Sequence, residues 1–215
     1  MRDVLEIIET ARFGTPLQYT LTSGQHFPHY RPAYRDIYYN SHATGGGAIQ
    51  DALTHMMNAA HWLFGPTTSL LCDASHLALQ HVTVEDTVHA LTRHGKLMGS
   101  LTLNQFQAPN ESTLQINFER CSIRVEFHQN RWRQCDHPEG DWHGGATYEL
   151  ERDDLFTMQA TSFLDAVENR SVTSCSLHEG LHTLHTNLAM LESWKSGKWV
   201  QLSIPAKKGL NNDDL

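Results

Sequence analysis

Large apolar residues recur at a spacing of two along short stretches in the middle of the chain, most clearly at 97–103 and 114–118. This alternation predicts β-strands with one face buried and the other exposed to water. Asn110-Glu111 and His128-Gln129-Asn130 are typical of turns, so we expect hairpins at both places. The strands predicted in this way span residues 17–22, 69–73, 84–93, 97–107, 112–118, 122–127 and 131–134.

The residues that follow the glycine run Gly45–Gly47 have apolar side chains spaced three and four apart, which predicts an amphipathic helix from residue 48. A second stripe on this helix holds Asp51, His55, Asn58 and Trp62. Residues four apart lie one above the other on the same face of a helix, so the Asp51 carboxylate and the His55 imidazole can point toward the same place. An acid beside an imidazole suits general acid–base chemistry, and a solvated surface pair is the alternative.

Helices are also predicted at 3–10, 153–168 and 178–196, and a long ordered loop at 27–44. Strands that follow one another through short turns form antiparallel sheets. The sequence therefore predicts an α+β domain, a mainly antiparallel β-sheet with helices packed on one face. On the other face Thr113, Gln115 and Asn117 are polar, and Trp132 on a later strand would interrupt that polar surface.

Length and composition fit a single soluble domain, with 215 residues of which 40% are hydrophobic and 19% charged. The formal net charge of −8 argues against nucleic acid and anionic membranes as partners, because both bind clustered Lys and Arg. No apolar run approaches the ~18 residues of a transmembrane helix, and the N-terminal residues do not form a signal peptide. The scattered cysteines then favour reduced thiols and a cytoplasmic location; they are Cys72, Cys121, Cys135 and Cys175.

One group among the 15 histidines matches a metal-site pattern. His178-Glu179-Gly180-Leu181-His182 fits the His-Glu-x-x-His motif of zinc peptidases, and His185 follows it. That motif needs a helix through both histidines and a third ligand, whereas Gly180 weakens the helix. We therefore predict a half-exposed histidine stripe and no metal.

The segment that begins with the three glycines resembles a known family. Gly45-Gly46-Gly47, followed by Asp51 and His55, resembles the Gly-Gly-Gly-x-x-x-Asp-x-x-x-His segment of the Gfo/Idh/MocA family of NAD(P)-dependent sugar, inositol and polyol dehydrogenases. Other stretches resemble further elements of the second domain of that family, in the same order: Gly14–Leu17, Gly24–Pro32, Val84–Val88, Gly99–Leu101, Phe163–Val167 and Glu179–Leu181. The resemblance covers residues 1–203 and implies a single C-terminal, substrate and oligomerisation domain, followed by a polar tail at 204–215.

The resemblance also implies which residues form the site. His55 would move the proton of a substrate hydroxyl, and Asp51 would orient the imidazole or hold a neighbouring hydroxyl. Arg31, Tyr34 and Gln25 would contact a sugar or polyol, although the tyrosines of the loop have packing onto the sheet as their alternative role. We expect Asp51 and His55 to point into one pocket roofed by that loop.

The cofactor-binding half of the family has no counterpart in this sequence. No Gly-x-Gly-x-x-Gly follows a strand-like run, and the catalytic lysine that the family carries in a Glu-Lys-Pro motif has no match. We expect the isolated chain to bind neither NAD(H) nor NADP(H) with micromolar affinity, and to be inactive by itself. It would be an incomplete dehydrogenase, or act with a nucleotide-binding partner.

Two functions of different classes remain open. The first is the substrate-binding part of an oxidoreductase, and the second is a non-enzymatic sugar-binding or scaffolding dimer that kept the pocket and lost the chemistry. The resemblance implies pairing of sheet to sheet, so in both cases we expect a homo-oligomer through the sheet face, with a monomer as the alternative.

Overall fold

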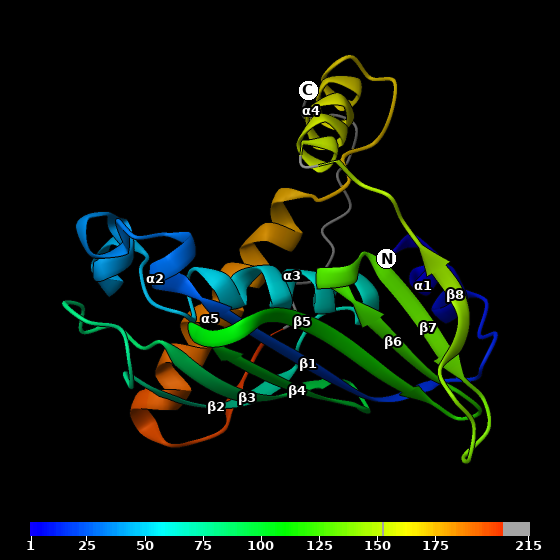
Figure 1. Cartoon of the computed structure of the whole chain (residues 1–215), viewed down its shortest axis with the longest axis horizontal. Helices are drawn as coiled ribbons and strands as arrows, with labels where there is room; N and C mark the ends of the chain where they lie inside the picture. The colour runs from blue at the N-terminus through cyan, green and yellow to red at the C-terminus, as the bar shows by residue number, and fades with distance from the viewer. Residues whose placement is uncertain (152, 204–215) are drawn as a thin grey trace.

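The structure, a computed structural model, describes residues 1–151 and 153–203, so the tail predicted at 204–215 lies outside it. Within these residues nine strands form one sheet in the order β8-β7-β6-β5-β1-β4-β3-β2-β9 (Figure 1). Neighbouring strands are antiparallel except β1 and β4, which run parallel. The strands are β1 (Pro16–His26), β2 (Ser69–Ser75), β3 (Thr87–His94), β4 (Leu97–Asn104), β5 (Phe106–Phe118), β6 (Ser122–Glu126), β7 (Arg131–Cys135), β8 (His143–Thr147) and β9 (Val200–Gln201).

The two faces of the sheet differ as the alternation predicts. In β5, Leu114 and Ile116 are fully buried, while Gln115 and Asn117 are half-exposed on the opposite face. The prediction that Trp132 interrupts this polar face is wrong. Trp132 pairs with Val125 in the register of β6 and β7, so its indole is buried on the helix side. There its Nε1 donates a hydrogen bond to the carboxylate of Asp3 at 3.0 Å.

Three helices pack on one face of the sheet, namely α1 (Arg2–Glu9), α3 (Ala52–Phe64) and α5 (Leu177–Ser196) (Figure 1). The inward side chains of α3 belong to the main hydrophobic core; they are Leu53, Met56, Met57, Ala60 and Leu63. α5 begins with a capping box between Ser176 and Glu179, which satisfies free backbone N–H groups at its start. These features confirm the predicted α+β class with its mainly antiparallel sheet.

The helix α4 (Asp154–Val167) forms as predicted but stands away from the sheet (Figure 1). None of its side chains is buried. Several of them are nevertheless large and apolar, with more than half of their surface exposed: Leu155, Phe156, Met158, Phe163, Leu164 and Val167. α4 therefore contributes little to the core of the described chain.

Some predicted boundaries differ from those observed. Asn110 and Glu111 do not form a hairpin turn, because they lie inside β5, which pairs with β1 along most of its length. The turn at His128–Asn130 is confirmed, with Asn130 in the left-handed conformation. The expected loop at 27–44 folds into short helical turns: α2 (Phe27–Tyr30), then 3₁₀ turns at Tyr34–Asp36, Tyr38–Asn40 and His42–Thr44.

None of the helices in the described ranges combines the length and apolar character that crossing a lipid bilayer requires. The four cysteines are free thiols, two of them buried.

Candidate functional site

The loop before α3 depends on its three glycines. Gly45 and Gly47 have φ values of 83° and 94°, a region that side chains other than glycine rarely adopt. A Cβ on Gly46 would lie 2.2 Å from the carbonyl oxygen of Tyr39, so this position has no room for a side chain. The loop is thereby pressed against the 3₁₀ turns that precede it.

The helix α3 begins at Ala52, later than the predicted residue 48. The reason is a wide turn in which the N–H of Leu53 bonds to the carbonyl of Ala48, five residues before it. Asp51 thus stands at the start of α3, but its side chain makes no capping hydrogen bond. The carboxylate instead points to the preceding loop, where it accepts a hydrogen bond of 2.6 Å from the Tyr38 hydroxyl.

A third residue, Arg31, lies close to the Tyr38 hydroxyl. The hydrogen bond to Asp51 raises the pKa of Tyr38, and the nearby guanidinium of Arg31 acts in the opposite direction. Arg31 is exposed and also lies over the Phe27 ring at 5.7 Å. The structure therefore brings together two predicted site residues, Asp51 and Arg31, through a third, Tyr38, that the sequence did not single out as a ligand contact.

The other two predicted ligand contacts lie elsewhere. Tyr34 is buried among aromatic and aliphatic side chains, and its hydroxyl donates to the backbone oxygen of Gln80 at 2.8 Å. These contacts match the packing alternative for that tyrosine. Gln25 is half-buried near the end of β1, and its side chain forms no hydrogen bond within the described residues.

His55 is exposed on α3, one turn beyond Asp51, and makes no hydrogen bond within residues 1–151 and 153–203. It lines a hollow of about 370 Å³ between α3 and α5, which we call the His55 hollow. Its floor includes Asn187, whose Nδ2 donates to Thr54 Oγ1 at 2.8 Å. Asp51 and His55 are therefore not joined in one pocket roofed by the loop: Asp51 faces the loop and His55 faces α5.

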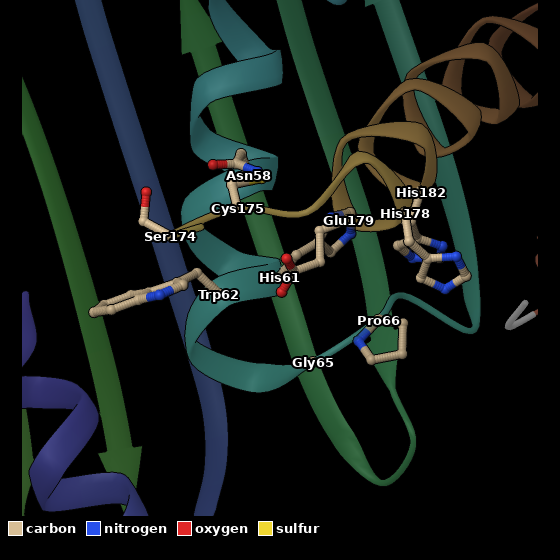
Figure 2. A pocket seen from close by; sticks show the side chains of 10 residues that line it. All are labelled: Asn58, His61, Trp62, Gly65, Pro66, Ser174, Cys175, His178, Glu179 and His182. Atoms are coloured by element: carbon tan, nitrogen blue, oxygen red, sulfur yellow. The ribbon is translucent and has the colours of Figure 1, made fainter. Parts of the chain in front are cut away.

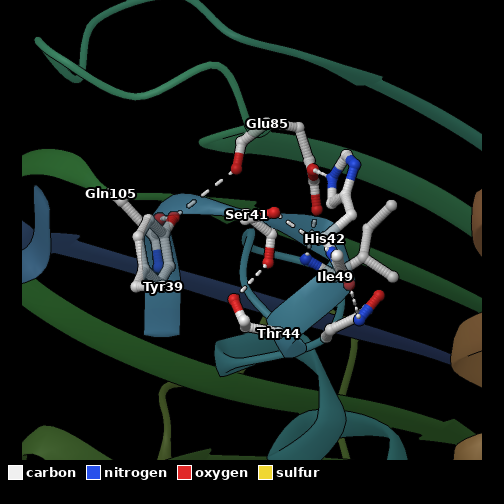
Figure 3. A network of polar contacts seen from close by, with 9 residues as sticks. Tyr39, Ser41, His42, Thr44, Ile49, Glu85 and Gln105 are labelled. Carbon is white, nitrogen blue, oxygen red and sulfur yellow. Dashed lines mark hydrogen bonds and ion pairs between the residues drawn. The ribbon is translucent and has the colours of Figure 1, made fainter. Parts of the chain in front are cut away.

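A buried carboxylate holds the segments on both sides of the glycine loop (Figure 3). Glu85 has no exposed surface, and its Oε1 accepts a hydrogen bond of 2.8 Å from the backbone N–H of Ile49. Its Oε2 lies 2.5 Å from Nε2 of His42, in the last 3₁₀ turn before the glycines. The backbone carbonyl of Glu85 also accepts a hydrogen bond from Ala48. Glu85 thus ties together the two segments that position the start of α3.

Asp86, the next residue, has a similar role in a different loop. Its carboxylate accepts hydrogen bonds from the backbone N–H groups of Leu77, Ala78 and Leu79. These donors hold the pKa of Asp86 below its usual range although burial acts to raise it. Sequence reasoning did not single out this acidic pair as structural. The available signal was two adjacent carboxylates between the valines Val84 and Val88 of a strand-like stretch.

A second hollow, of about 320 Å³, lies between the end of α3 and the start of α5 (Figure 2). We call it the Trp62 cavity after the indole on one of its walls. Two of its histidines are held by threonines. His61 contacts the hydroxyls of Thr67 at 2.9 Å and Thr183 at 3.1 Å, and His182 Nε2 accepts the backbone N–H of Thr67 at 3.1 Å.

His61 and the neighbouring His94 are neutral in the folded protein near neutral pH. Burial, together with the neighbouring His182 and His94, lowers the pKa of His61 to about 3. Burial also lowers the pKa of His94 to about 4. An uncharged imidazole can both donate and accept a hydrogen bond, which is how these rings are used here.

The His-Glu-x-x-His motif lies at this cavity but is engaged in other contacts. His182 accepts the Thr67 N–H, and the Glu179 carboxylate caps α5 through Ser176. Among the described residues no group of three or more His, Cys, Asp or Glu side chains is arranged to hold a metal ion.

The sequence and the fold were compared with those of known proteins. The family model described as the GFO/IDH/MocA C-terminal domain matches residues 1–124. The WlbA dehydrogenase from Bordetella pertussis, solved with NADH and UDP-GlcNAcA, has a TM-score of 0.76 and 22% sequence identity, covering 94% of this chain and 61% of that chain. Levoglucosan dehydrogenase in complex with NADH has a TM-score of 0.81 and 18% identity, covering 93% of this chain and 62% of that chain.

A further similar structure is an oxidoreductase from Agrobacterium radiobacter in complex with NAD+, L-tartaric acid and magnesium. It has a TM-score of 0.76 and 16% identity, covering 93% of this chain and 60% of that chain. No curated protein matches the sequence. At these identities the likeness shows the fold, and the chain spans about three fifths of the length of the solved structures.

Proposed function

Because this chain belongs to the GFO/IDH/MocA C-terminal domain family, we propose that it is the substrate-binding part of a sugar or polyol dehydrogenase and acts with a nucleotide-binding domain. The similar structures support this proposal, since their names identify dehydrogenases of sugars or sugar derivatives, solved with NADH. The chain would supply the surface that binds and orients the hydroxyl to be oxidised.

The observation that carries the proposal is the position of His55. Its imidazole is exposed, has no hydrogen-bond partner among the described residues, and stands at the edge of a hollow one helical turn from Asp51. An imidazole nitrogen can accept a proton, so this group suits removal of the proton from a substrate hydroxyl. Asp51 does not bond to His55, which favours the role of holding a neighbouring hydroxyl.

Arg31 and Tyr38 fit the same proposal. Tyr38 fixes the Asp51 carboxylate in one orientation, and a fixed acceptor loses less entropy when a hydroxyl binds to it. Arg31 is exposed beside this pair and can donate to a sugar oxygen. Tyr34 and Gln25 are less suited, because the Tyr34 hydroxyl is already bonded and Gln25 lies back on β1.

The described residues do not fit a dinucleotide. A pyrophosphate is usually held by free backbone N–H groups at a glycine-rich helix start. Here the carboxylate of Glu85 fills that space, with its oxygens 2.6 Å from where a Cβ of Gly47 would stand. The Glu85 carboxylate also accepts the hydrogen bond from the N–H of Ile49, and its negative charge would repel phosphate. We therefore assign to this chain only the transfer of the substrate proton. The hydride acceptor must be bound by a different domain.

The test is an activity measurement in the presence of a nucleotide-binding domain, either one encoded beside this chain or the one from levoglucosan dehydrogenase. Reduction of NAD(P)+ is followed with a panel of sugars and polyols. His55→Ala should lower the rate roughly 10²- to 10⁴-fold. Because His55 is exposed, the free energy of unfolding should change by less than ~0.5 kcal/mol.

The matched control is His89→Ala, an exposed histidine on the opposite face of the sheet, which should leave the rate unchanged. Equal rates for wild type and His55→Ala would refute the assignment. If no pairing produces activity while sugars still bind, the non-enzymatic sugar-binding alternative stands. An in-frame nucleotide-binding segment upstream in the coding region would favour the dehydrogenase.

A further inference from the structure

The polar stripe of α3 continues beyond His55. Asn58 and Trp62 follow His55 at positions three and seven along the helix, and all three are exposed. They therefore lie along one side of α3. His55 lines the His55 hollow and Trp62 lines the Trp62 cavity, while Asn58 lines both. The two hollows thus adjoin between α3 and α5, and we call the continuous surface from His55 through Asn58 to Trp62 the seam.

The chemistry of this seam favours an uncharged, hydroxyl-rich ligand. Neither hollow has Lys or Arg in its described lining, and burial lowers the pKa of His61 and of His182, so a phosphate or nucleotide would find no permanently charged cation there. Trp62 keeps 38% of its surface exposed. Figure 2 shows its indole standing apart from the histidines on the far side of the cavity. The negative face of an indole attracts the slightly positive C–H groups of a sugar ring.

Two amides on the seam have hydrogen-bonding capacity left. Asn58 donates from Nδ2 to Thr183 Oγ1 at 3.5 Å, and among the described residues its side-chain oxygen accepts no hydrogen bond. Asn187 is 3% exposed at the floor of the His55 hollow, and its Oδ1 has no partner within the described chain. A buried acceptor without a partner is costly, and a ligand hydroxyl or a water at this floor would relieve that cost.

The length of the seam decides between a single sugar and a longer one. At a rise of 1.5 Å per residue, His55 and Trp62 are separated by about 10 Å along α3. One hexose ring is too short to contact both side chains. We propose that the seam binds an uncharged disaccharide or longer glycoside, with the reacting sugar beside His55 and the next sugar on Trp62. This inference rests on the proposed function, and it defines the substrate class of the same site.

The test is a titration of the whole chain, followed by NMR, with cellobiose, maltose and lactose and with the component sugars glucose and galactose. Signals of the His55 ring and the Trp62 indole N–H report the two ends separately. At least one disaccharide should shift both signals and bind roughly 3- to 10-fold more tightly than its component sugars, the range expected for one aromatic contact. Trp62→Ala should abolish that difference.

Trp199→Ala is the matched control, because Trp199 is also exposed and lies outside both hollows. Its disaccharide affinity should equal that of wild type. If sugars shift only His55, with equal affinity for mono- and disaccharides, the extended ligand is refuted and the proposed function survives. If only Trp62 shifts, the two hollows do not share one ligand, and both proposals fail. If no sugar shifts either signal, both fail as well.

Discussion

At the scale of single residues, the most consequential side chain outside the proposed site is Glu85. It is a fully buried carboxylate that serves His42, Ile49 and the glycine loop together. Buried charges are tolerated only where they are paired and hydrogen-bonded. Glu85 therefore stabilises the arrangement that presents Asp51 and His55.

Removing this carboxylate should destabilise the fold. In Glu85→Ala the N–H of Ile49 and the ring of His42 lose their acceptor, and we expect the free energy of unfolding to fall by about 1–3 kcal/mol. Urea denaturation measures it. Glu139→Ala, at an exposed carboxylate in a turn, is the control and should have little effect. Equal stability of the two variants would show that the Glu85 contacts are energetically neutral.

The buried histidines predict a dependence of stability on pH. The pKa values of His61 and His94 are about 3 and about 4 in the folded chain, below their ordinary value of 6.5. On acidification the unfolded chain therefore binds protons first, so stability is complete above pH 6.5 and falls as the pH drops toward the folded pKa values. Each histidine contributes a slope of up to about 1.4 kcal/mol per pH unit in this window.

Urea denaturation between pH 7 and pH 5 checks this effect, because most carboxylates titrate below that range. His61→Gln should show a shallower slope than wild type, whereas His89→Gln, at an exposed histidine, should keep the wild-type slope. A stability that is constant from pH 7 to pH 5 would contradict the assignment of His61 and His94 as neutral buried groups.

At the scale of elements, α3 and α4 contrast sharply. Both have apolar residues at helical spacing, but α3 buries its apolar side chains in the main core and α4 buries none. Periodicity predicts that a helix has an apolar face, and it does not say which surface covers that face. The partner of an apolar face is a tertiary property.

This contrast gives a direct stability test. Phe156 and Phe163 of α4 are 71% and 67% exposed, so changing either to Ser should alter the free energy of unfolding by less than ~0.5 kcal/mol. Leu53→Ala in α3 should cost about 2–5 kcal/mol, because Leu53 is fully buried in the core. Thermal or urea denaturation compares the variants. A large loss from Phe156→Ser would mean that α4 packs against the rest of this chain.

At the scale of the whole molecule, the face of the sheet opposite the helices remains open. It is polar at Thr20 and Gln115, and it has an exposed apolar region at Leu91 and Met98, which are 48% and 49% exposed. Such a face suits contact with a second copy of the chain, and dimers with two-fold symmetry are the commonest oligomers. We therefore expect a dimer formed by this face.

Sedimentation tests this expectation. A specific dimer should bury roughly 1,200 Å² or more in total and persist at tens of micromolar protein. Leu91→Glu should produce monomers of 24.4 kDa, while Leu188→Glu on the helix side should leave the dimer intact. A wild-type chain that sediments only as a 24.4 kDa species would rule out the sheet-face dimer.

Only the outline of the candidate site could be predicted from the sequence. The four-residue spacing predicts that Asp51 and His55 lie one turn apart on one helix. In the structure Asp51 is the residue just before α3 and His55 lies in the first turn of α3, and the two side chains face different elements. Their surroundings were not predictable, because Tyr38, Glu85 and Asn187 approach from distant positions in the chain. The packing role of Tyr34 likewise depends on a bond to Gln80, far away in sequence.

The sequence by itself determined the α+β class, the buried and exposed faces of strands such as β5, the inward stripe of α3 and the family. These follow from local periodicity and from short motifs, which act over a few residues. Only the tertiary structure decided that Asp51 faces the loop while His55 faces α5, that Glu85 supports the glycines, and that α4 stands apart. Such facts depend on contacts between segments far apart in the chain, and residue spacing does not encode them.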